Sequence, residues 1–294
     1  LPAITGWQAG GSVQVLDLTF GLISLAALFA AKILRIPVVI HESDSSPGRV
    51  TRWAAKFADK IALSYPSAAD YFPKQKALGK IAFTGNPIRK DIIMPLTNGA
   101  REYLKLEDGV PTIFIMGGSQ GAQMINDAVI DGLPELVSKY QIIHQTGTKN
   151  LQMAKDTASV ILKDNPHASR YHPMDYLNDL TMRMAAGMSS IVISRAGSTI
   201  FEISAWGLPS IIIPLPKEIS HDQTANAFAY SHSGACTVIE ESNLTSHILL
   251  AEIDRIINNK HINDRMREGA HKFSHLDAAD KIAEVILEIA LKHE

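Results

Sequence analysis

The stretch Ile115–Asp127, IMGGSQGAQMIND, follows an apolar run and turns abruptly into glycine. From Ala122 to Tyr140, apolar residues recur every four positions, which is helical spacing. The stretch therefore predicts a strand, a tight loop and a helix start. Glycine lets a ligand approach the backbone, and a helix start offers unpaired N–H groups and a partial positive charge. We expect this loop to hold an anion, a phosphate being the first candidate. The loop consists of Gly117, Gly118, Ser119, Gln120 and Gly121.

Two common phosphate-binding patterns do not fit this loop. A P-loop needs Lys and then Ser or Thr after its last glycine, whereas Ala122 and Gln123 follow here. A dinucleotide fingerprint needs Gly-x-Gly-x-x-Gly and an acidic residue after the next strand. That strand, Gln141–His144, is followed by Gln-Thr-Gly. An ordinary tight turn between strand and helix stays open as the alternative.

The composition fits a soluble globular protein with room for two domains. The chain has 294 residues, of which 46% are hydrophobic and 20% charged. Its single cysteine, Cys236, excludes an internal disulfide, and no Cys/His spacing indicates a metal site. The uncharged run Leu18–Ala31 is shorter than the about 20 residues that span a bilayer. We expect it to form a buried strand end and a helix, and contact of part of it with a membrane stays open.

The net charge of −2 hides an asymmetry along the chain. Residues 1–90 carry eleven Lys/Arg and five Asp/Glu, and the remainder carries 17 basic and 25 acidic residues. A basic surface can face nucleic acid or anionic lipid. Because no nucleic-acid-binding motif accompanies it, we expect an anionic membrane surface and no nucleic acid as the partner. A solvated face with a chance bias is the alternative.

Strand-like and helix-like segments alternate in both halves, which predicts an α/β fold with parallel sheets covered by helices. We expect a first domain at 1–94, a connector at 95–110, a second domain at 111–275 and a C-terminal helix at 276–294 that packs toward the first domain. The strands expected in the second half are Thr112–Met116, Gln141–His144, Ser190–Ser194 and Ser210–Pro214. Ligands of such sheets lie beyond the carboxyl ends of the strands, so the polar loops there are candidate site walls.

Three further loops suit a sugar nucleotide. In SRAGSTIFE (194–202), Ser198 or Thr199 with Glu202 fits a helix capping box; alternatively, Glu202 accepts both hydroxyls of a ribose. In PLPKEISHDQTAN (214–226), Gln223 offers a carboxamide to sugar hydroxyls. In TGNPIR (84–89), we expect Arg89 to reach a diphosphate from the opposite domain. Together the loops predict a nucleotide diphosphate-sugar in a cleft between the domains.

Six motifs occur in one order along the chain: IPVVIHESDSSPGRVTRWAAKFAD, TGNPIR, MGGSQGA, QTG, SRAGSTIFEISAWGLPSIIIPLP and DQTANA. From about Ile36 to the C-terminus this series resembles the MurG family of bacterial glycosyltransferases. The resemblance implies two Rossmann-like domains facing across a cleft (GT-B type), with the N-terminal domain incomplete here. It implies inverting transfer of N-acetylglucosamine from UDP-N-acetylglucosamine to the 4-hydroxyl of an undecaprenyl-linked muramyl-peptide. It further implies peripheral attachment to the cytoplasmic face of the bacterial cell membrane and no cofactor.

The resemblance also implies roles for single residues. Ser119 matches the serine on the donor diphosphate, and Arg89 matches the arginine of the Gly-Asn-Pro motif. Glu202 matches the ribose-binding carboxylate, and Gln223 matches the glutamine on the N-acetylglucosamine. Leu177 lies where the family has an apolar residue against uracil.

The chain departs from the family pattern in its loops. Ser198 and Thr199 lie in a donor loop one residue shorter than usual, and Asp44 stands where an asparagine contacts the sugar. The family's N-terminal Gly-rich loop with its histidine, a proposed base, has no counterpart, so the chain looks like a fragment. We assign no catalytic base, and Asp44 is the one candidate.

Two other functions stay open. One is a truncated or inactive UDP-sugar-binding module, which would bind the donor without transfer. The other is a UDP-sugar epimerase of similar architecture, which would consume the sugar nucleotide without an acceptor.

Overall fold

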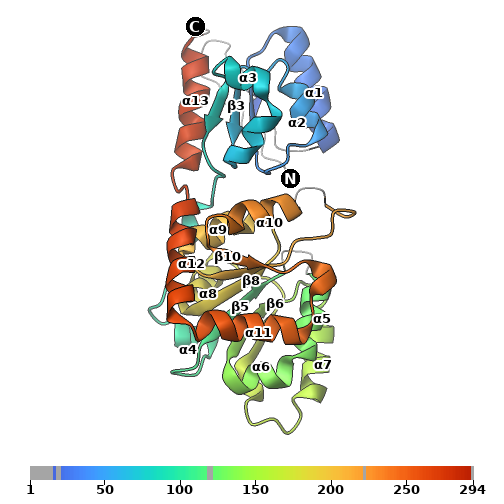
Figure 1. Cartoon of the computed structure of the whole chain (residues 1–294), viewed down its shortest axis with the longest axis vertical. Helices are drawn as coiled ribbons and strands as arrows, with labels where there is room; N and C mark the ends of the chain where they lie inside the picture. Colours follow the sequence, from blue (N-terminus) through green and yellow to red (C-terminus); the bar gives the residue numbers. More distant parts are fainter. Residues whose placement is uncertain (1–15, 18–20, 118–121, 221–222, 293–294) are drawn as a thin grey trace. The chain divides into compact units, whose positions relative to one another are not determined.

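The computed structural model describes residues 16–17, 21–117, 122–220 and 223–292 (Figure 1). Its internal contacts group the chain into two units. Unit 1 comprises Leu1–Pro87 and His275–Glu294, and unit 2 comprises Ile88–Ser274. The domain limits expected from the sequence stay predictions.

Unit 1 is built on a parallel sheet of four strands in the order β1-β2-β3-β4. Its strands are β1 (Leu16–Asp17), β2 (Val38–Glu42), β3 (Lys60–Leu63) and β4 (Ile81–Phe83). Its helices are α1 (Gly21–Leu34), α2 (Arg49–Ala54), the 3-10 helix η1 (Pro66–Tyr71), α3 (Pro73–Ala77) and α13 (Ala278–Lys292). Helix α13 lies on one side of the sheet, with α1 and α2 on the other (Figure 1). Apolar residues of β2 and β3 are buried as continuous runs, as expected of parallel strands covered on both faces.

The turn that follows β4 is fixed within unit 1. The His41 ring nitrogen Nε2 lies 3.0 Å from the Ser64 hydroxyl and 3.1 Å from the Gly85 carbonyl oxygen. Gly85 has φ +82°, and a Cβ atom there would lie 2.5 Å from the His275 Cβ. Only glycine fits this combination of left-handed backbone and close approach.

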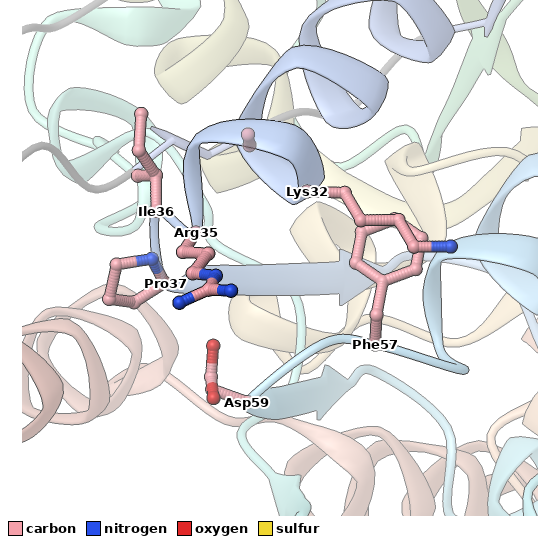
Figure 2. Close-up of a pocket in the computed structure, with 7 residues that line it drawn as sticks. Lys32, Arg35, Ile36, Pro37, Phe57 and Asp59 are labelled. Carbon is pink, nitrogen blue, oxygen red and sulfur yellow. The ribbon is translucent and has the colours of Figure 1, made fainter.

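The end of α1 is apolar, basic and exposed. Phe29, Ile33 and Leu34 are 57%, 64% and 68% exposed. Next to them, the Lys32 ammonium lies 5.2 Å from the centre of the Phe57 ring. A pocket of about 180 Å³ opens beside it, lined by Ala31, Lys32, Arg35, Ile36, Pro37, Phe57 and Asp59 (Figure 2). Across the described part of the chain, no helix is both long and apolar enough to cross a membrane.

Unit 2 is built on a parallel sheet of six strands in the order β10-β9-β8-β5-β6-β7. The strands are β5 (Thr112–Met116), β6 (Gln141–Gln145), β7 (Tyr171–Met174), β8 (Ser189–Ser194), β9 (Ser210–Ile212) and β10 (Cys236–Val238). The chain leaves β5 toward β6 and β7 and then returns to place β8 on the other side of β5. The strand order therefore switches between β5 and β8, which is where open α/β sheets bind ligands.

Helices cover both faces of this sheet (Figure 1). They are α4 (Ala100–Leu104), α5 (Gln123–Asp131), α6 (Leu133–Lys139), α7 (Leu151–Ile161), α8 (Asp179–Met188), α9 (Thr199–Trp206), α10 (Gln223–Ser231), α11 (Ser246–Ile257) and α12 (Lys260–Phe273). Side chains alternate along β5: Ile113 and Ile115 join the core under α5, α6 and α11, and Phe114 and Met116 join the core under α8 and α9.

The helix expected over Ala122–Tyr140 is two helices, α5 and α6. The break falls at Gly132, and Pro134 occupies the first turn of α6. Proline lacks an N–H and is tolerated in a first turn but not in a helix interior, so the sequence contained the signal for this break.

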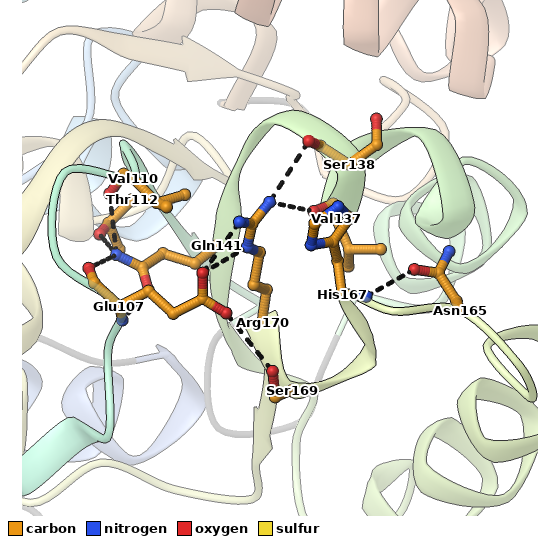
Figure 3. Close-up of polar contacts among 10 residues, drawn as sticks. All are labelled: Glu107, Val110, Thr112, Val137, Ser138, Gln141, Asn165, His167, Ser169 and Arg170. Atoms are coloured by element: carbon orange, nitrogen blue, oxygen red, sulfur yellow. Dashed lines mark hydrogen bonds and ion pairs between the residues drawn. The ribbon is translucent and has the colours of Figure 1, made fainter.

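Polar side chains anchor the amino ends of the strands of unit 2. The Gln141 amide nitrogen donates to the carbonyl oxygens of Glu107 and Val110, at 3.1 and 2.8 Å (Figure 3). Nearby, the Arg170 guanidinium donates to the Val137 carbonyl oxygen at 3.0 Å and pairs with the Glu107 carboxylate at 2.8 Å. These bonds fasten the segment before β5 to the sheet.

Candidate functional site

The carboxyl ends of the strands of unit 2 are joined by backbone hydrogen bonds. The Gly117 N–H after β5 donates to the Gln145 carbonyl oxygen of β6 at 3.3 Å. The Thr146 N–H donates to Met174 of β7 at 2.9 Å, and the Ile213 N–H donates to Ser194 of β8 at 2.8 Å. The predicted anion loop begins at Gly117, and its other residues, Gly118, Ser119, Gln120 and Gly121, lie outside the described residues.

Two predicted site residues, Arg89 and Glu202, lie together at this edge. Arg89 Nη2 lies 3.3 Å from the Glu202 carboxylate, and Nη1 lies 2.6 Å from the Asp179 carboxylate. All three residues are in unit 2. The sequence placed Arg89 in the first domain; its contacts group it with unit 2, because the chain passes from one unit to the other just before Ile88.

The Glu202 carboxylate is partly buried. Glu202 lies in the first turn of α9, and its side chain is 18% exposed. Loss of solvation raises the pKa of Glu202, the nearby Arg89 charge lowers it, and the outcome is a raised pKa. The capping-box alternative is not realised, because Ser198, the described N-cap residue of α9, makes no side-chain capping bond. Thr199 is the first residue of the same helix.

The loop before α8 is fixed by a capping asparagine. The Asn178 side-chain oxygen accepts from the Thr181 N–H at 2.9 Å and from the Thr181 hydroxyl at 3.0 Å. The adjacent Leu177 is fully buried. This cap sets the direction in which Asp179, the first residue of α8, meets Arg89.

Two amides of α10 hold the loops that follow β8 and β9. The Gln223 side-chain oxygen accepts from the Leu215 N–H at 3.1 Å. The Asn226 amide nitrogen donates to the Ala196 carbonyl oxygen at 3.3 Å. Gln223 therefore lies against the loop after β9.

A buried polar chain lies beneath the start of α5. His144 Nε2 lies 3.0 Å from the Asn126 side-chain oxygen, and Nδ1 lies 2.9 Å from the Tyr171 hydroxyl. Because an amide oxygen only accepts, Nε2 carries the proton and Nδ1 accepts from the tyrosine. Complete burial lowers the pKa of His144 to about 3, so the ring is neutral. The chain ties α5 to β6 and β7, and our sequence interpretation missed it.

The predicted residue Asp44 lies in unit 1, in the loop after β2. The Glu42 carboxylate organises this loop by accepting from the Asp44 N–H at 3.1 Å and from the Gly48 N–H at 3.3 Å. Burial raises the pKa of Glu42, while these bonds oppose the rise. Glu42 is thus a loop-organising residue that the motif reading passed over.

Two of the residues missed from the sequence, Asp179 and His144, have partners that are distant along the chain. Asp179 meets Arg89 across 90 positions, and His144 meets Tyr171 across 27. The one local signal was the Asn-x-x-Thr spacing from Asn178 to Thr181, which is typical of a helix start.

Comparisons with known proteins agree with this architecture. The family model "Glycosyltransferase family 28 C-terminal domain" matches residues 112–282, and "Glycosyltransferase family 28 N-terminal domain" matches residues 13–63. The UDP-N-acetylglucosamine–N-acetylmuramyl-(pentapeptide) pyrophosphoryl-undecaprenol N-acetylglucosamine transferase of Limosilactobacillus fermentum is 33% identical over 280 residues. This match covers 94% of this chain and 73% of the relative. The Lactiplantibacillus plantarum protein of the same name is 34% identical, covering 91% and 72%.

Solved structures share the fold. The crystal structure of Acinetobacter baumannii MurG superposes with a TM-score of 0.70 at 21% identity, covering 93% of this chain and 73% of that chain. The S. aureus MnaA–UDP structure superposes with a TM-score of 0.62 at 14% identity, covering 92% and 73%. At these identities the likeness shows the fold alone. With the family matches, it confirms the expected α/β fold of two Rossmann-like domains of GT-B type.

Proposed function

Because the chain belongs to the MurG family of N-acetylglucosaminyltransferases, within glycosyltransferase family 28, we propose that it transfers N-acetylglucosamine from UDP-N-acetylglucosamine to an undecaprenyl-linked muramyl-peptide. The observation that carries this proposal is the partly buried Glu202 carboxylate, paired with Arg89 at the switch point of the sheet of unit 2. It supplies charged acceptor and donor groups where such sheets bind nucleotides.

The donor would lie along the carboxyl edge of unit 2. Glu202 has two oxygens that can accept from both hydroxyls of a ribose. Gln223 would lie beside the sugar, whereas the predicted uracil contact Leu177 is fully buried and has no exposed surface for the base. The Gln223 oxygen is used by the Leu215 N–H, so its amide nitrogen is the group for a sugar oxygen. Ser198 and Thr199 would form the loop wall, and Ser119 with its neighbouring glycines would meet the diphosphate.

Arg89 is placed to act on the diphosphate. A guanidinium has five N–H donors, and the contacts of Arg89 to Asp179 and Glu202 use its two terminal nitrogens, Nη1 and Nη2. Asp179 fixes the side chain by the shorter contact, so the remaining donors can meet diphosphate oxygens without the loss of that anchor.

The reaction we propose inverts the anomeric centre. The acceptor's sugar 4-hydroxyl attacks the anomeric carbon, the bond to the diphosphate breaks, and UDP leaves with the bonding electrons. Negative charge grows on the leaving diphosphate, where Arg89 and the start of α5 would stabilise it. A base must accept the hydroxyl proton. Asp44 stays the one candidate that this chain offers.

We place unit 1 against an anionic membrane, at the cytoplasmic face of the cell membrane. The support is the exposed apolar end of α1, formed by Phe29, Ile33 and Leu34. Lys32 and Arg35, which line the pocket beside this end, supply the cations (Figure 2). Apolar side chains beside cations suit a lipid interface with acidic headgroups. An enzyme for a lipid-linked acceptor must reach that surface.

A coupled UDP-release assay tests the function, with and without an undecaprenyl-linked muramyl-peptide. We expect turnover only with this acceptor, and a product heavier by one N-acetylglucosamine by mass spectrometry. Turnover only with a different acceptor would contradict the assignment. Consumption of the donor without any acceptor would instead favour an epimerase.

A further inference from the structure

One guanidinium connects three loops at the carboxyl edge of unit 2. Arg195 follows β8 directly, and its Nη1 donates to the carbonyl oxygens of Ile213 and Pro214, after β9, at 3.2 and 3.4 Å. Its Nη2 pairs with the carboxylate of Glu241, which begins the 3-10 helix η4 (Glu241–Asn243) after β10. The two side chains are only 13% and 12% exposed.

Burying the Arg195–Glu241 ion pair costs free energy, but the contacts of the pair have defined directions. Removing two charges from water offsets most of their attraction, so a buried ion pair is a weak source of net stability. A planar guanidinium, however, fixes the groups it contacts in defined directions. The Arg195–Glu241 pair is therefore better suited to orienting loops than to stabilising the fold.

The loop that Arg195 orients is the one that Gln223 contacts. The Pro214 carbonyl belongs to the peptide whose N–H is that of Leu215, and this N–H donates to the Gln223 side-chain oxygen. A single peptide group is thus held by Arg195 on its oxygen and by Gln223 on its nitrogen. A shift of that peptide moves the Gln223 amide directly.

We propose that Arg195 is a positioning residue that favours the sugar-bearing nucleotide over the bare nucleoside diphosphate, with Glu241 as its counter-ion. The proposal rests on the proposed function, in which Gln223 meets the sugar. In that function, Glu202 contacts the ribose and Arg89 contacts the diphosphate. Arg89 pairs with Asp179 and Glu202, and neither pair involves Arg195 or Glu241. Loss of Arg195 therefore weakens binding of UDP-N-acetylglucosamine and leaves binding of UDP nearly unchanged.

The same unit holds a matched control at the opposite edge of the sheet. Arg170 lies just before β7, is also 13% exposed, donates to the successive carbonyl oxygens of Val137 and Ser138, and pairs with Glu107 (Figure 3). Like Arg195, Arg170 contacts two carbonyl oxygens and a carboxylate, but it does so at the amino ends of the strands.

The test is titration calorimetry of the full chain with UDP and with UDP-N-acetylglucosamine, in the native protein and in Arg195→Lys, Glu241→Gln and Arg170→Lys. A lysine keeps the positive charge but lacks the planar set of N–H donors of a guanidinium. We therefore expect Arg195→Lys to weaken binding of UDP-N-acetylglucosamine about tenfold and binding of UDP less than twofold. Glu241→Gln, which keeps the shape, should weaken the sugar nucleotide about threefold. Arg170→Lys should leave the ratio of the two affinities unchanged.

Equal weakening of both ligands by Arg195→Lys, or no change in either, would overturn the proposal. So would the same selective loss in Arg170→Lys, since it would reflect general destabilisation. If Arg195→Lys fails to fold, the ratio of the UDP-N-acetylglucosamine affinity to the UDP affinity in Glu241→Gln tests the proposal: an unchanged ratio would overturn it. Failure of the native chain to bind either ligand would instead refute the proposed function.

Discussion

The carboxylate of Glu202 and the guanidinium of Arg89 are 113 positions apart along the chain, and the guanidinium influences the ionisation of the carboxylate. Burial raises the pKa of Glu202, and Arg89 opposes this by stabilising the ionised form. The ionised state of Glu202, which the proposed contact with a ribose requires, therefore depends on its cationic neighbour Arg89.

Replacing Arg89 by Gln should shift the pH dependence of UDP binding. Without the cation, burial and the Asp179 charge act unopposed, so the pKa of Glu202 rises further. UDP affinity falls as pH drops through this pKa, and in Arg89→Gln the fall should begin at a higher pH than in the native chain. Calorimetry between pH 5 and 8 measures both profiles with the same ligand. Parallel profiles would show that Arg89 does not support the Glu202 charge.

His144 should make stability depend on pH. Its pKa is about 3 in the folded protein, against an unfolded value of 6.5, so below pH 6.5 the unfolded chain binds a proton that the folded chain does not. The free energy of unfolding should therefore fall as pH drops from 6.5, by roughly 2 kcal/mol at pH 5 from this residue. Urea unfolding of the native chain and of His144→Gln measures the difference between the two slopes. Identical slopes would contradict a buried neutral ring.

Among the elements, α8 matters because its first turn carries Asp179. Replacing the capping Asn178 by Ala should cost about 1 kcal/mol of stability and also weaken UDP binding, since Asp179 anchors Arg89. Asn259 caps α12 in the same way, accepting from the Ile262 N–H at 3.1 Å. Asn259→Ala should lose similar stability without a change in UDP affinity. Thermal unfolding measures the stability of both variants, and calorimetry measures their affinity for UDP. An equal loss of UDP affinity in the two variants would show that α8 has no specific role in UDP binding.

The sequence predicted elements well where apolar periodicity was strong. Thr112–Met116 was predicted as β5 with both ends correct, because four consecutive apolar residues after Thr112, in a segment bounded by Pro111 and Gly117, have few alternatives. Strand β7 escaped notice because Tyr171–Met174 is short and contains Pro173, which an edge strand tolerates. Missing β7 also hid α8 and hence Asp179. The positions of loops that carry sequence motifs could be predicted from the sequence. The side-chain partners that meet across the sheet could not, because they depend on the complete order of the strands.

On the scale of the whole molecule, the proposed membrane contact rests on the end of α1. Replacing Ile33 and Leu34 together by Gln should lower binding to vesicles of mixed anionic and neutral phospholipid about tenfold or more, since each buried aliphatic side chain contributes about 1.5–3 kcal/mol. Added salt should weaken the binding further through Lys32 and Arg35. Val160 of unit 2, 74% exposed, gives the matched control Val160→Gln. Cosedimentation with no difference between the two variants would place the membrane contact elsewhere.

Binding of the uridine diphosphate at the carboxyl edge of unit 2 is proposed to depend on Glu202. Its most direct test is a calorimetric titration of the full chain with UDP, compared with Glu202→Gln and with Glu268→Gln, an exposed glutamate of α12. Hydrogen bonds to a charged group contribute about 1.5–3 kcal/mol, so Glu202→Gln should bind UDP at least about tenfold more weakly, while Glu268→Gln should match the native chain. Native affinity in Glu202→Gln, or no UDP binding by the native chain, would contradict the account.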